Sequence, residues 1–322
     1  MINIGIIGGA GYTGGELCRV LLNHPEADLV FVNSINYAGR LLTDVHGGLF
    51  DETDLCFTED MPFDEADVVF VCSEYGKSNQ FLSEHYIPAD VHIIDLTQDF
   101  SPAEDYNDYI YGLPELNRAQ IINASHVTNP GDLSTGVQLG LLPLAEAGLL
   151  HSDISVHSII GTSGHSESSP MEGWKARMQG GMSILQSFEQ EQLTETTHSL
   201  NLLQPDFKGH LDWISYRGSF PRGIFTTEVM TCNAPMDEIA GYYRDFYSEA
   251  SFTHYADEPL DIRQVVNTNK CLIHAERHRD KLIVTTCIDN LLKGSAGQAV
   301  QNMNLMFGFE ETTGLRLKAS VF

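Results

Sequence analysis

Basic residues are scarce in this chain. Lys and Arg number 18 against 44 Asp and Glu, which gives a formal net charge of −26 over 322 residues. A surface of this charge repels a phosphate backbone or an anionic membrane. We therefore expect neither nucleic acid nor a membrane as a partner, and we interpret the excess acidity as a solvated surface.

Long apolar runs and closely spaced cysteines are also lacking. No stretch approaches the length of a membrane span, and the N-terminus enters a strand-like segment without the features of a signal peptide, so a cytoplasmic location is expected. The cysteines form no CxxC or Cys/His cluster, which argues against a metal site and a disulfide scaffold. They are Cys18, Cys56, Cys72, Cys232, Cys271 and Cys287.

The chain opens with a strand, a glycine turn and a helix. "INIGIIGG" is rich in β-branched residues, and an apolar stripe beginning at Leu17 follows the turn. A GxGxxG pattern in this context predicts that a dinucleotide pyrophosphate binds at the N-terminus of the helix, whereas a generic strand-to-helix turn is the alternative. The predicted cofactor residues here are Gly8, Gly9, Gly11, Tyr12, Thr13 and Gly14.

The end of the next strand indicates which dinucleotide binds. "ADLVFVNSI" reaches Asn33 and Ser34 where an NAD-specific fold places a carboxylate on the ribose hydroxyl. No acid repels a 2′-phosphate there, and Arg40 follows closely. The pattern favours NADP, with Ser34 and Arg40 near the phosphate, although Arg40 could equally be a solvated surface residue.

Alternating strands and helices predict an α/β fold. Further strand-like runs occur at 66–72, 91–96 and 126–130, which indicates a Rossmann-type, doubly wound parallel sheet. From about residue 151 the pattern changes. Strands at 153–160 and 225–231 bracket a polar, helix-prone stretch, and 271–289 is typical of a hairpin, so we expect a second, mixed α/β domain.

The segment "TNPGDLST" predicts a tight turn that opens a helix. Asp132 stands just before an apolar run of helical spacing. The N-terminus of a helix binds anions and can activate a nucleophile, because its N–H groups and the helix dipole favour negative charge. An aspartate there is most simply an N-cap, with binding of a cationic group or action as a base as the alternatives.

Several segments together resemble the N-acyl-γ-glutamyl-phosphate reductases of arginine biosynthesis. The matching pieces are "GGAGYTGGEL", "YGLPELNR", "NPG", "YRGSFPRGI" and "DNLLKGSAGQAVQNMNLM", in the family's order along nearly the whole chain. The resemblance implies a fold like that of semialdehyde dehydrogenases. It further implies an NADP-binding domain of residues 1–150 completed by 291–322, a substrate and oligomerisation domain of 151–290, and a homo-oligomer, either a dimer or a tetramer.

The resemblance also implies site residues. Asn290 would contribute to the cofactor site. The substrate site would include Asn129, Gly131, Tyr216, Arg217 and Arg222. Whether the two arginines and Lys293 bind a substrate anion or form structural ion pairs is open at this point.

The chain departs from the family where the chemistry takes place. In the family a cysteine follows the NPG turn and forms a thioacyl-enzyme that NADPH reduces, but this chain has Asp132 there. Gln190 and Gln192 of "FEQEQLTE" occupy the positions of the histidines that include the general acid/base, Ser101 replaces an arginine after "DF", and "TSGHSESS" replaces a glycine-rich loop.

These departures remove a nucleophile, a proton-transfer group and anion-binding groups. Gln192 cannot shuttle protons near neutral pH. His165 is a speculative partner for Asp132, while Cys72 ends a strand and is more simply a buried structural residue than a substitute nucleophile. Two hypotheses follow. One is an oxidoreductase that reduces its substrate by direct hydride transfer or has changed substrate, and the other is a non-catalytic NADP-binding paralogue that regulates or assembles with an intact reductase.

Overall fold

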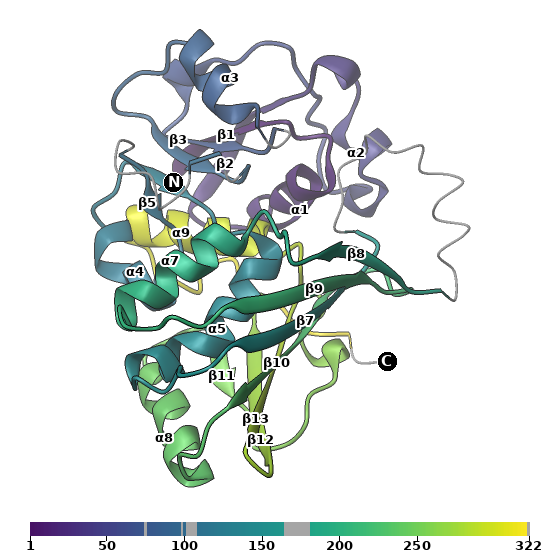
Figure 1. Ribbon diagram of the computed structural model, residues 1–322. Coiled ribbons are helices and arrows are strands. Elements are labelled where there is room, and N and C mark those ends of the chain that lie inside the picture. The colour runs from purple at the N-terminus through teal and green to yellow at the C-terminus, as the bar shows by residue number, and fades with distance from the viewer. Residues whose placement is uncertain (74–75, 98, 101–107, 164–180, 321–322) are drawn as a thin grey trace. The chain divides into compact units, whose positions relative to one another are not determined.

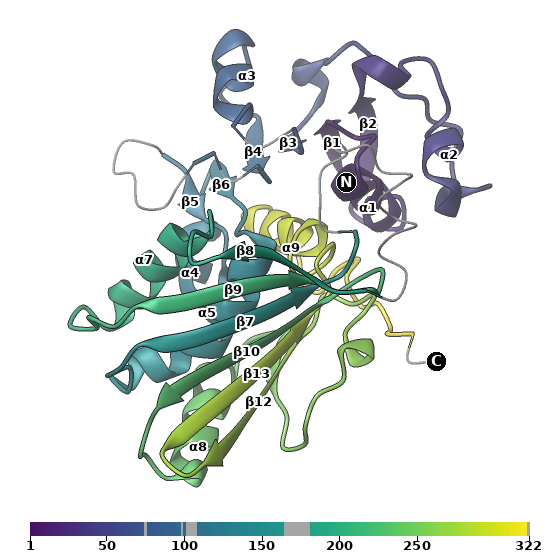
Figure 2. The same ribbon diagram turned by 45° about the vertical axis from the view of Figure 1, so that its right-hand side comes forward.

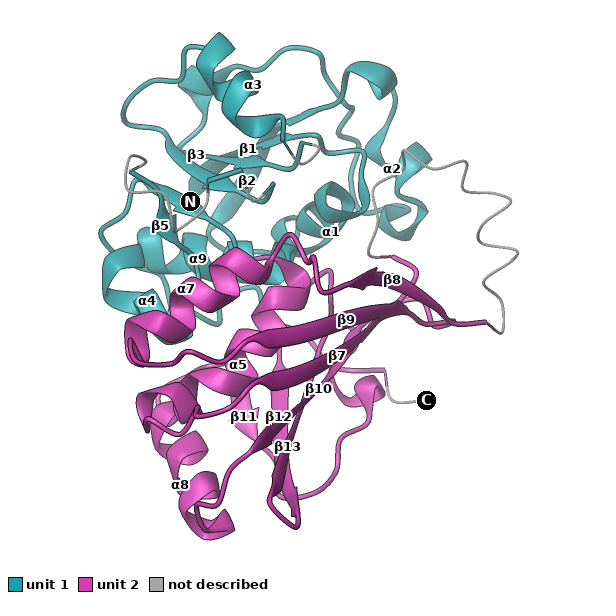
Figure 3. Cartoon of the chain, in the orientation of Figure 1, with its two compact units in different colours: residues 1–130, 295–316 teal, residues 131–294, 317–322 magenta. Residues whose placement is uncertain are grey.

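A computed structural model describes residues 1–73, 76–97, 99–100, 108–163 and 181–320. The chain divides into two compact units, shown in different colours in Figure 3. The first unit comprises Met1–Pro130 and Ser295–Arg316, and the second comprises Gly131–Gly294 and Leu317–Phe322.

The first unit is built on a six-stranded sheet in which every pairing is parallel (Figure 1). The strands lie in the order β2-β1-β3-β4-β6-β5, so the chain leaves β1 in both directions, as in a doubly wound fold. They are β1 (Ile2–Ile7), β2 (Ala27–Asn33), β3 (Val68–Val71), β4 (His92–Asp95), β5 (Ile110–Tyr111) and β6 (His126–Thr128).

The helices of the first unit are α1 (Tyr12–Leu21), α2 (Leu42–Val45), α3 (Ser78–Glu84), α4 (Pro114–Ile121) and α9 (Ala296–Met306). Helix α9 comes from the far end of the chain and packs on α1 and α4. Two of its amide side chains, Gln298 and Asn302, donate to the carbonyl of Gly112 over 2.7 and 2.9 Å. Buried hydrogen bonds of this kind fix α9 within the first unit.

The second unit contains a seven-stranded mixed sheet (Figure 2). Its order is β11-β12-β13-β10-β7-β9-β8. The strands are β7 (Ile154–Ile160), β8 (Ser183–Ser187), β9 (Leu211–Arg217), β10 (Ile224–Thr231), β11 (Thr253–Tyr255), β12 (Cys271–His278) and β13 (Lys281–Ile288). Burial alternates residue by residue along β7 and β10, so one face of the sheet is covered and the other is partly open.

In the described part of the second unit, three α-helices accompany this sheet: α5 (Asp132–Glu146), α7 (Leu193–Leu203) and α8 (Met236–Phe246). Helix α5 packs on β10 and β13 and against α7 and α8. Thirteen of its residues, Leu133 to Ala145, are buried. A helix apolar on all sides is stable only when it is enclosed, and this enclosure holds its N-terminus in a defined place.

The predicted fold class is confirmed. The parallel sheet, the strands at 153–160 and 225–231 and the 271–289 hairpin are all present, the last with His278 opposite Lys281. The stretch between 160 and 225 was expected to be mainly helical, but it contains β8 and β9 as well as α7. The compact units divide after Pro130 rather than near 150, because α5 packs within the second unit.

Candidate functional site

The glycine turn after β1 brings backbone atoms unusually close together. Gly8 has a φ of +75°, and a Cβ there would lie 2.7 Å from the carbonyl oxygen of Cys72. A Cβ on Gly14 would lie 2.5 Å from the Cα of Gly9. At Gly11, the N-cap of α1, the nearest atom would be 3.8 Å away, so the space over this helix start is open.

Two neighbours hold this turn in place. The N–H of Gly9 donates to the carbonyl oxygen of Asn33 over 2.9 Å, and the Nε2 of His46 lies 2.8 Å from the carbonyl oxygen of Gly9. A Cβ on Gly15 would lie 2.5 Å from the His46 ring, so the ring packs closely on α1. Sequence reasoning missed His46, because a single histidine 37 residues beyond the turn has no spacing signal.

The strand that follows α1 ends in polar residues, as expected. The side chain of Asn33 donates to the carbonyls of Thr58 and Glu59, each over 3.2 Å, so it ties down the neighbouring segment. Arg40 is half exposed, lies 5.5 Å from the centre of the Tyr37 ring and is 3.9 Å from Asp44. The guanidinium of Arg40 therefore lies at the protein surface.

These features fit a dinucleotide. The open space over Gly11, the first turn of α1 and the absence of a carboxylate at Asn33 and Ser34 suit a pyrophosphate and a 2′-phosphate. Thr13 also approaches Ser295, the N-cap of α9, with 3.4 Å between the two hydroxyl oxygens. The cofactor assignment of Tyr12, Thr13, Ser34 and Arg40 stays a prediction.

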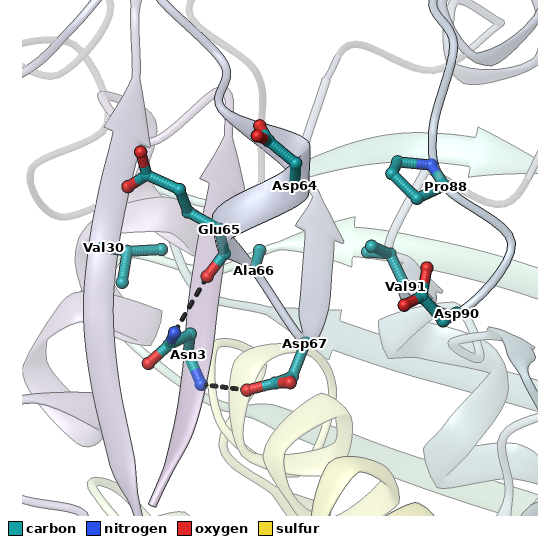
Figure 4. Close-up of a pocket in the computed structure, with 9 residues that line it drawn as sticks. All are labelled: Asn3, Val30, Asp64, Glu65, Ala66, Asp67, Pro88, Asp90 and Val91. Carbon is teal, nitrogen blue, oxygen red and sulfur yellow. Dashed lines mark hydrogen bonds between the residues drawn. The ribbon is translucent and has the colours of Figure 1, made fainter.

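A cavity in the first unit lies at the other end of its sheet (Figure 4). It measures about 460 Å³ and is bordered by the amino ends of strands β1, β3 and β4. Asn3 closes one side, with its N–H 2.7 Å from Asp67 and its amide nitrogen 2.9 Å from the carbonyl oxygen of Glu65. The glycine turn follows the carboxyl end of β1, so this cavity is not the cofactor site.

A buried polar cluster lies at the carboxyl end of β4, at the same end of the sheet as the glycine turn. Asp95 ends β4 and accepts hydrogen bonds from the hydroxyls of Ser78 and Thr97, over 2.6 and 2.8 Å. Burial raises the pKa of Asp95 to about 6, against the opposing effect of these hydrogen bonds. The adjacent Cys72 is partly buried, and desolvation raises the pKa of its thiol well above the usual value. A thiol of raised pKa is a poor nucleophile.

Asp132 is the first residue of α5, not its N-cap. The N-cap is Gly131, which has an extended backbone (φ −62°, ψ 148°) and no side chain that could cap the helix. The N-cap interpretation of Asp132 was therefore wrong by one position, because the chain already has helical geometry at Asp132. Its carboxylate accepts instead from the N–H of Leu133, over 2.8 Å.

Gln192 reaches the same helix start. Its Oε1 accepts from the N–H of Ser134 over 2.7 Å, and its Nε2 donates to the carboxylate of Asp132 over 3.1 Å. The side chains at positions 132 and 192 are therefore in direct contact. Gln190 points elsewhere, since its amide donates to the hydroxyl of Ser215 on β9 over 2.9 Å.

Glu195 is the third side chain at this helix start, and sequence reasoning missed it. It is 8% exposed, and its two carboxylate oxygens lie 3.2 and 3.4 Å from the N–H of Gly131. A Cβ on Gly131 would lie 2.3 Å from Gln192 and 2.6 Å from Glu195, so both pack tightly on the turn. The only available signal was its place at the end of "QLTE", one helical turn after Gln192.

Three of the predicted substrate residues lie at the end of β9 or shortly after it. Tyr216 and Arg217 are consecutive on β9 and point to opposite faces of the sheet, since only the second is buried. The Tyr216 hydroxyl lies 3.2 Å from His157. Arg222 forms an ion pair with the fully buried Asp289 over 2.9 Å, which is the structural role left open above.

The remaining predicted residues are held by hydrogen bonds within their own units. Asn129, in the first unit, donates to the carbonyl of Ser295 over 3.3 Å. Asn290, in the second, accepts from the N–H of Gly223 over 2.7 Å. Lys293 is completely buried. His165 lies outside the described residues.

Other reactive groups are limited in the described part of the chain. None of the six cysteines, all of which lie in the described residues, forms a disulfide, and four are buried. No group of three or more His, Cys, Asp and Glu side chains among the described residues could hold a metal ion. Nor does any helix in these parts of the chain have the length and apolar content needed to cross a membrane.

Comparison with known proteins defines the class. Residues 3–124 match the family model of the semialdehyde dehydrogenase NAD binding domain, and residues 133–290 match the semialdehyde dehydrogenase dimerisation domain. The fold is also that of aspartate semialdehyde dehydrogenase II from Vibrio cholerae, with a TM-score of 0.73 and 19% identity over 96% of this chain and 98% of that one. A Candida albicans aspartate semialdehyde dehydrogenase, solved with NADP, gives a TM-score of 0.72 at 16% identity over 95% and 98% of the two chains.

Closer relatives define the family within this class. The N-acetyl-γ-glutamyl-phosphate reductases of Phocaeicola vulgatus and Bacteroides thetaiotaomicron are 52% and 51% identical over all 322 residues and over the whole of each relative. That of Flavobacterium johnsoniae is 41% identical, again over the full length of both chains. The chain belongs to the N-acetyl-γ-glutamyl-phosphate reductase family, as its motifs predicted.

Proposed function

We propose that this chain is an NADP-binding member of its family that does not form a thioacyl intermediate, and that it acts as a non-catalytic regulatory or oligomerisation partner of an intact reductase. The observation that carries the proposal is the hydrogen-bonded arrangement of Asp132 and Gln192 at the start of α5. In a thioacyl mechanism this place requires a thiolate and a proton-transfer group.

The chemistry of a carboxylate supports this proposal. Attack by Asp132 on an acyl phosphate would exchange one mixed anhydride for another, with no gain in reactivity toward hydride. A phosphate about 4 Å from this carboxylate would also be repelled by about 4 kcal/mol at an effective dielectric constant of 20. Gln192 is committed to two hydrogen bonds and has no titratable proton.

Retained oxidoreductase activity is the second candidate. It is favoured by the full-length identity of 52% to a protein named as an N-acetyl-γ-glutamyl-phosphate reductase. Such activity would proceed by direct hydride transfer to the acyl phosphate, in the arginine pathway, or to another carbonyl or imine. A genome that carries a second family member with Cys and His at the positions of 132 and 192 favours the regulatory role, whereas a sole copy in an arginine prototroph favours activity.

The proposed cofactor is NADP. The family model of the first unit is that of an NAD binding domain, and a structural neighbour was solved with NADP. The pyrophosphate would lie over Gly8, Gly9, Gly11 and Gly14, with the 2′-phosphate near Ser34 and Arg40. When bound, this cofactor supplies a hydride donor. We place the protein in the cytoplasm.

A substitution of Arg40 tests the cofactor assignment. Arg40 is half exposed, and its ion pair with the equally exposed Asp44 is loose at 3.9 Å, so its guanidinium can bind a 2′-phosphate. Arg40→Ala should weaken NADPH binding about tenfold and leave NADH binding unchanged, as measured by fluorescence titration. Arg316→Ala, in the same unit, removes an equal charge and should change neither affinity. Equal losses for both nucleotides with Arg40→Ala would contradict the assignment.

The proposed role itself is tested by binding and turnover together. The protein should bind NADPH and should not oxidise it in the presence of an N-acyl-γ-glutamyl phosphate. Substantial turnover by the unmodified chain would overturn the regulatory role, and failure to bind NADPH would overturn the cofactor assignment.

A further inference from the structure

The start of α5 is filled by oxygen atoms of the protein's own side chains. A helix start leaves N–H groups without partners in the helix, and these groups bind anions. Here the carboxylate of Asp132 accepts from Leu133, and the carboxylate of Glu195 accepts from Gly131. The amide oxygen of Gln192 accepts from Ser134.

The orientation of the Gln192 amide follows from these contacts. The N–H of Ser134 can only donate, so it must meet the oxygen of the amide, and the nitrogen is left to donate to Asp132. The main chain of Gln192 is also fixed, because the hydroxyl of Thr196 lies 2.9 Å from its carbonyl oxygen and 2.8 Å from the hydroxyl of Ser134. Asp132 and Gln192 are therefore hydrogen-bonded to each other and to the first N–H groups of α5.

The space around the Asp132 and Gln192 side chains is also tightly packed. A Cβ on Gly131 would lie 2.3 Å from Gln192, and a Cβ on Gly294 would lie 3.0 Å from the Cβ of Asp132. Glu195 is more than nine-tenths buried, and its carboxylate is directed at the same turn. An incoming oxyanion would need both the N–H groups and the volume that these side chains already occupy.

We propose that Asp132 and Gln192 keep oxyanions out of the α5 helix start by occupying it themselves, so that Asp132 serves as a built-in substitute for a bound anion. Asp132 is thus a specificity-determining residue that closes the site to phosphorylated ligands. This inference deepens the proposed function. Phosphate binding is measured without NADPH or turnover, so the two can fail separately.

The test is binding of inorganic phosphate at constant ionic strength, followed by titration calorimetry and by the amide NMR signals of Leu133 and Ser134. The unmodified protein should show no shift of these signals. Asp132→Ala removes the occupying carboxylate and should bind phosphate at least about tenfold more tightly. Asp132→Asn removes the charge but keeps an acceptor for Leu133 and Gln192 in the same place, so it should bind phosphate clearly more weakly than Asp132→Ala.

Two further variants keep the test decisive. Asp237→Ala makes the same charge change in the first turn of α8 and should give no gain. If Asp132→Ala does not fold, Gln192→Ala combined with Asp132→Asn vacates the N–H of Ser134 and should give the same gain. The proposal is overturned if Asp132→Asn binds as well as Asp132→Ala, since charge alone would then exclude anions. It is equally overturned if phosphate shifts the Leu133 and Ser134 signals of the unmodified protein, or if Asp132→Ala gains no phosphate binding at these two N–H groups.

Discussion

Glu228 places a carboxyl group in the interior of the second unit. It lies at the middle of β10, is 0% exposed, and neither of its carboxyl oxygens has a hydrogen-bond partner among the described residues. A Cβ on Gly140 of α5 would lie 2.3 Å from one of these oxygens. Burial alone raises the pKa of Glu228 well above 4.5, so the group is held neutral in the folded protein.

An apolar residue of similar size should therefore stabilise the protein. Glu228→Met removes two unsatisfied polar atoms without a large change of volume, and we expect the free energy of unfolding to rise by about 1–3 kcal/mol. Chemical denaturation at neutral pH measures this change. A less stable Met variant would show that the carboxyl group has a favourable role in the fold.

The same residue predicts a pH dependence. In the unfolded chain Glu228 ionises near pH 4.5, whereas in the folded protein it keeps its proton to a much higher pH. The folded state then binds more protons, so the stability contributed by this group is complete below pH 4.5 and falls as the pH rises, by about 1.4 kcal/mol per unit. Glu228→Gln should remove this slope, and parallel slopes for the two proteins would contradict the assignment.

At the scale of elements, the turn between β1 and α1 depends on close backbone contacts. A Cβ on Gly14 would lie 2.5 Å from the Cα and 2.6 Å from the carbonyl oxygen of Gly9, and neither atom can move aside as a flexible side chain would. Gly14→Ala should lower the free energy of unfolding by about 1–3 kcal/mol and weaken NADPH binding, because the turn that should receive the pyrophosphate is displaced.

Gly48 provides a matched control in the same unit. A Cβ there meets no atom within 4 Å. Gly48→Ala should change stability by no more than about 0.5 kcal/mol and should leave NADPH binding intact. Thermal unfolding with and without NADPH compares the two variants. Equal behaviour would show that the tight contacts at Gly14 are not needed for the cofactor.

At the scale of the whole molecule, the seven-stranded sheet has a face on which side chains are only half buried. Its central positions are Ser155 and His157 on β7, Phe225 and Thr227 on β10, and Thr285 on β13. Helices α5 and α8 pack against this sheet from one side (Figures 1 and 2). Because residues 133–290 match a dimerisation domain, we propose that the half-buried face pairs with a second copy or with an intact relative.

A charge at the centre of this face tests the pairing. Thr227 lies opposite His157 on one side and Thr285 on the other. Thr227→Glu would bury a carboxylate in the interface and should weaken self-association at least about tenfold, as measured by analytical ultracentrifugation. Thr43→Glu, in the first unit, should have no effect. If the unmodified protein is monomeric at micromolar concentration, it does not form a homo-oligomer, and pairing with an intact relative is the only assembly left.

Local sequence patterns predicted most of the fold. The glycine turn and the hairpin have signals within one or two elements, and the structure places both where the pattern does. Strands β8 and β9 were missed because "SILQS" and "LDWISYR" are short and partly polar, and only pairing with β7 makes them strands.

The candidate site was only partly predictable for a similar reason. The resemblance located Asp132 and Gln192, but the spacing of 60 residues said nothing of the hydrogen bond between them. The contribution of Glu195 depends on how α7 begins beside α5, and that of His46 on the return of a loop to Gly9. These contacts are set by tertiary packing and leave no periodic signal in the sequence.

With Asp132 and Gln192 in place, the start of α5 lacks the thiolate and the proton-transfer group that thioacyl chemistry requires. Steady-state oxidation of NADPH with an N-acyl-γ-glutamyl phosphate tests it most directly, for the chain as it stands and for Asp132→Cys combined with Gln192→His. We expect no turnover by the unmodified chain, with NADPH binding intact in both proteins, and any recovered activity should appear only in the double variant. Turnover by the unmodified chain equal to that of the double variant would contradict it.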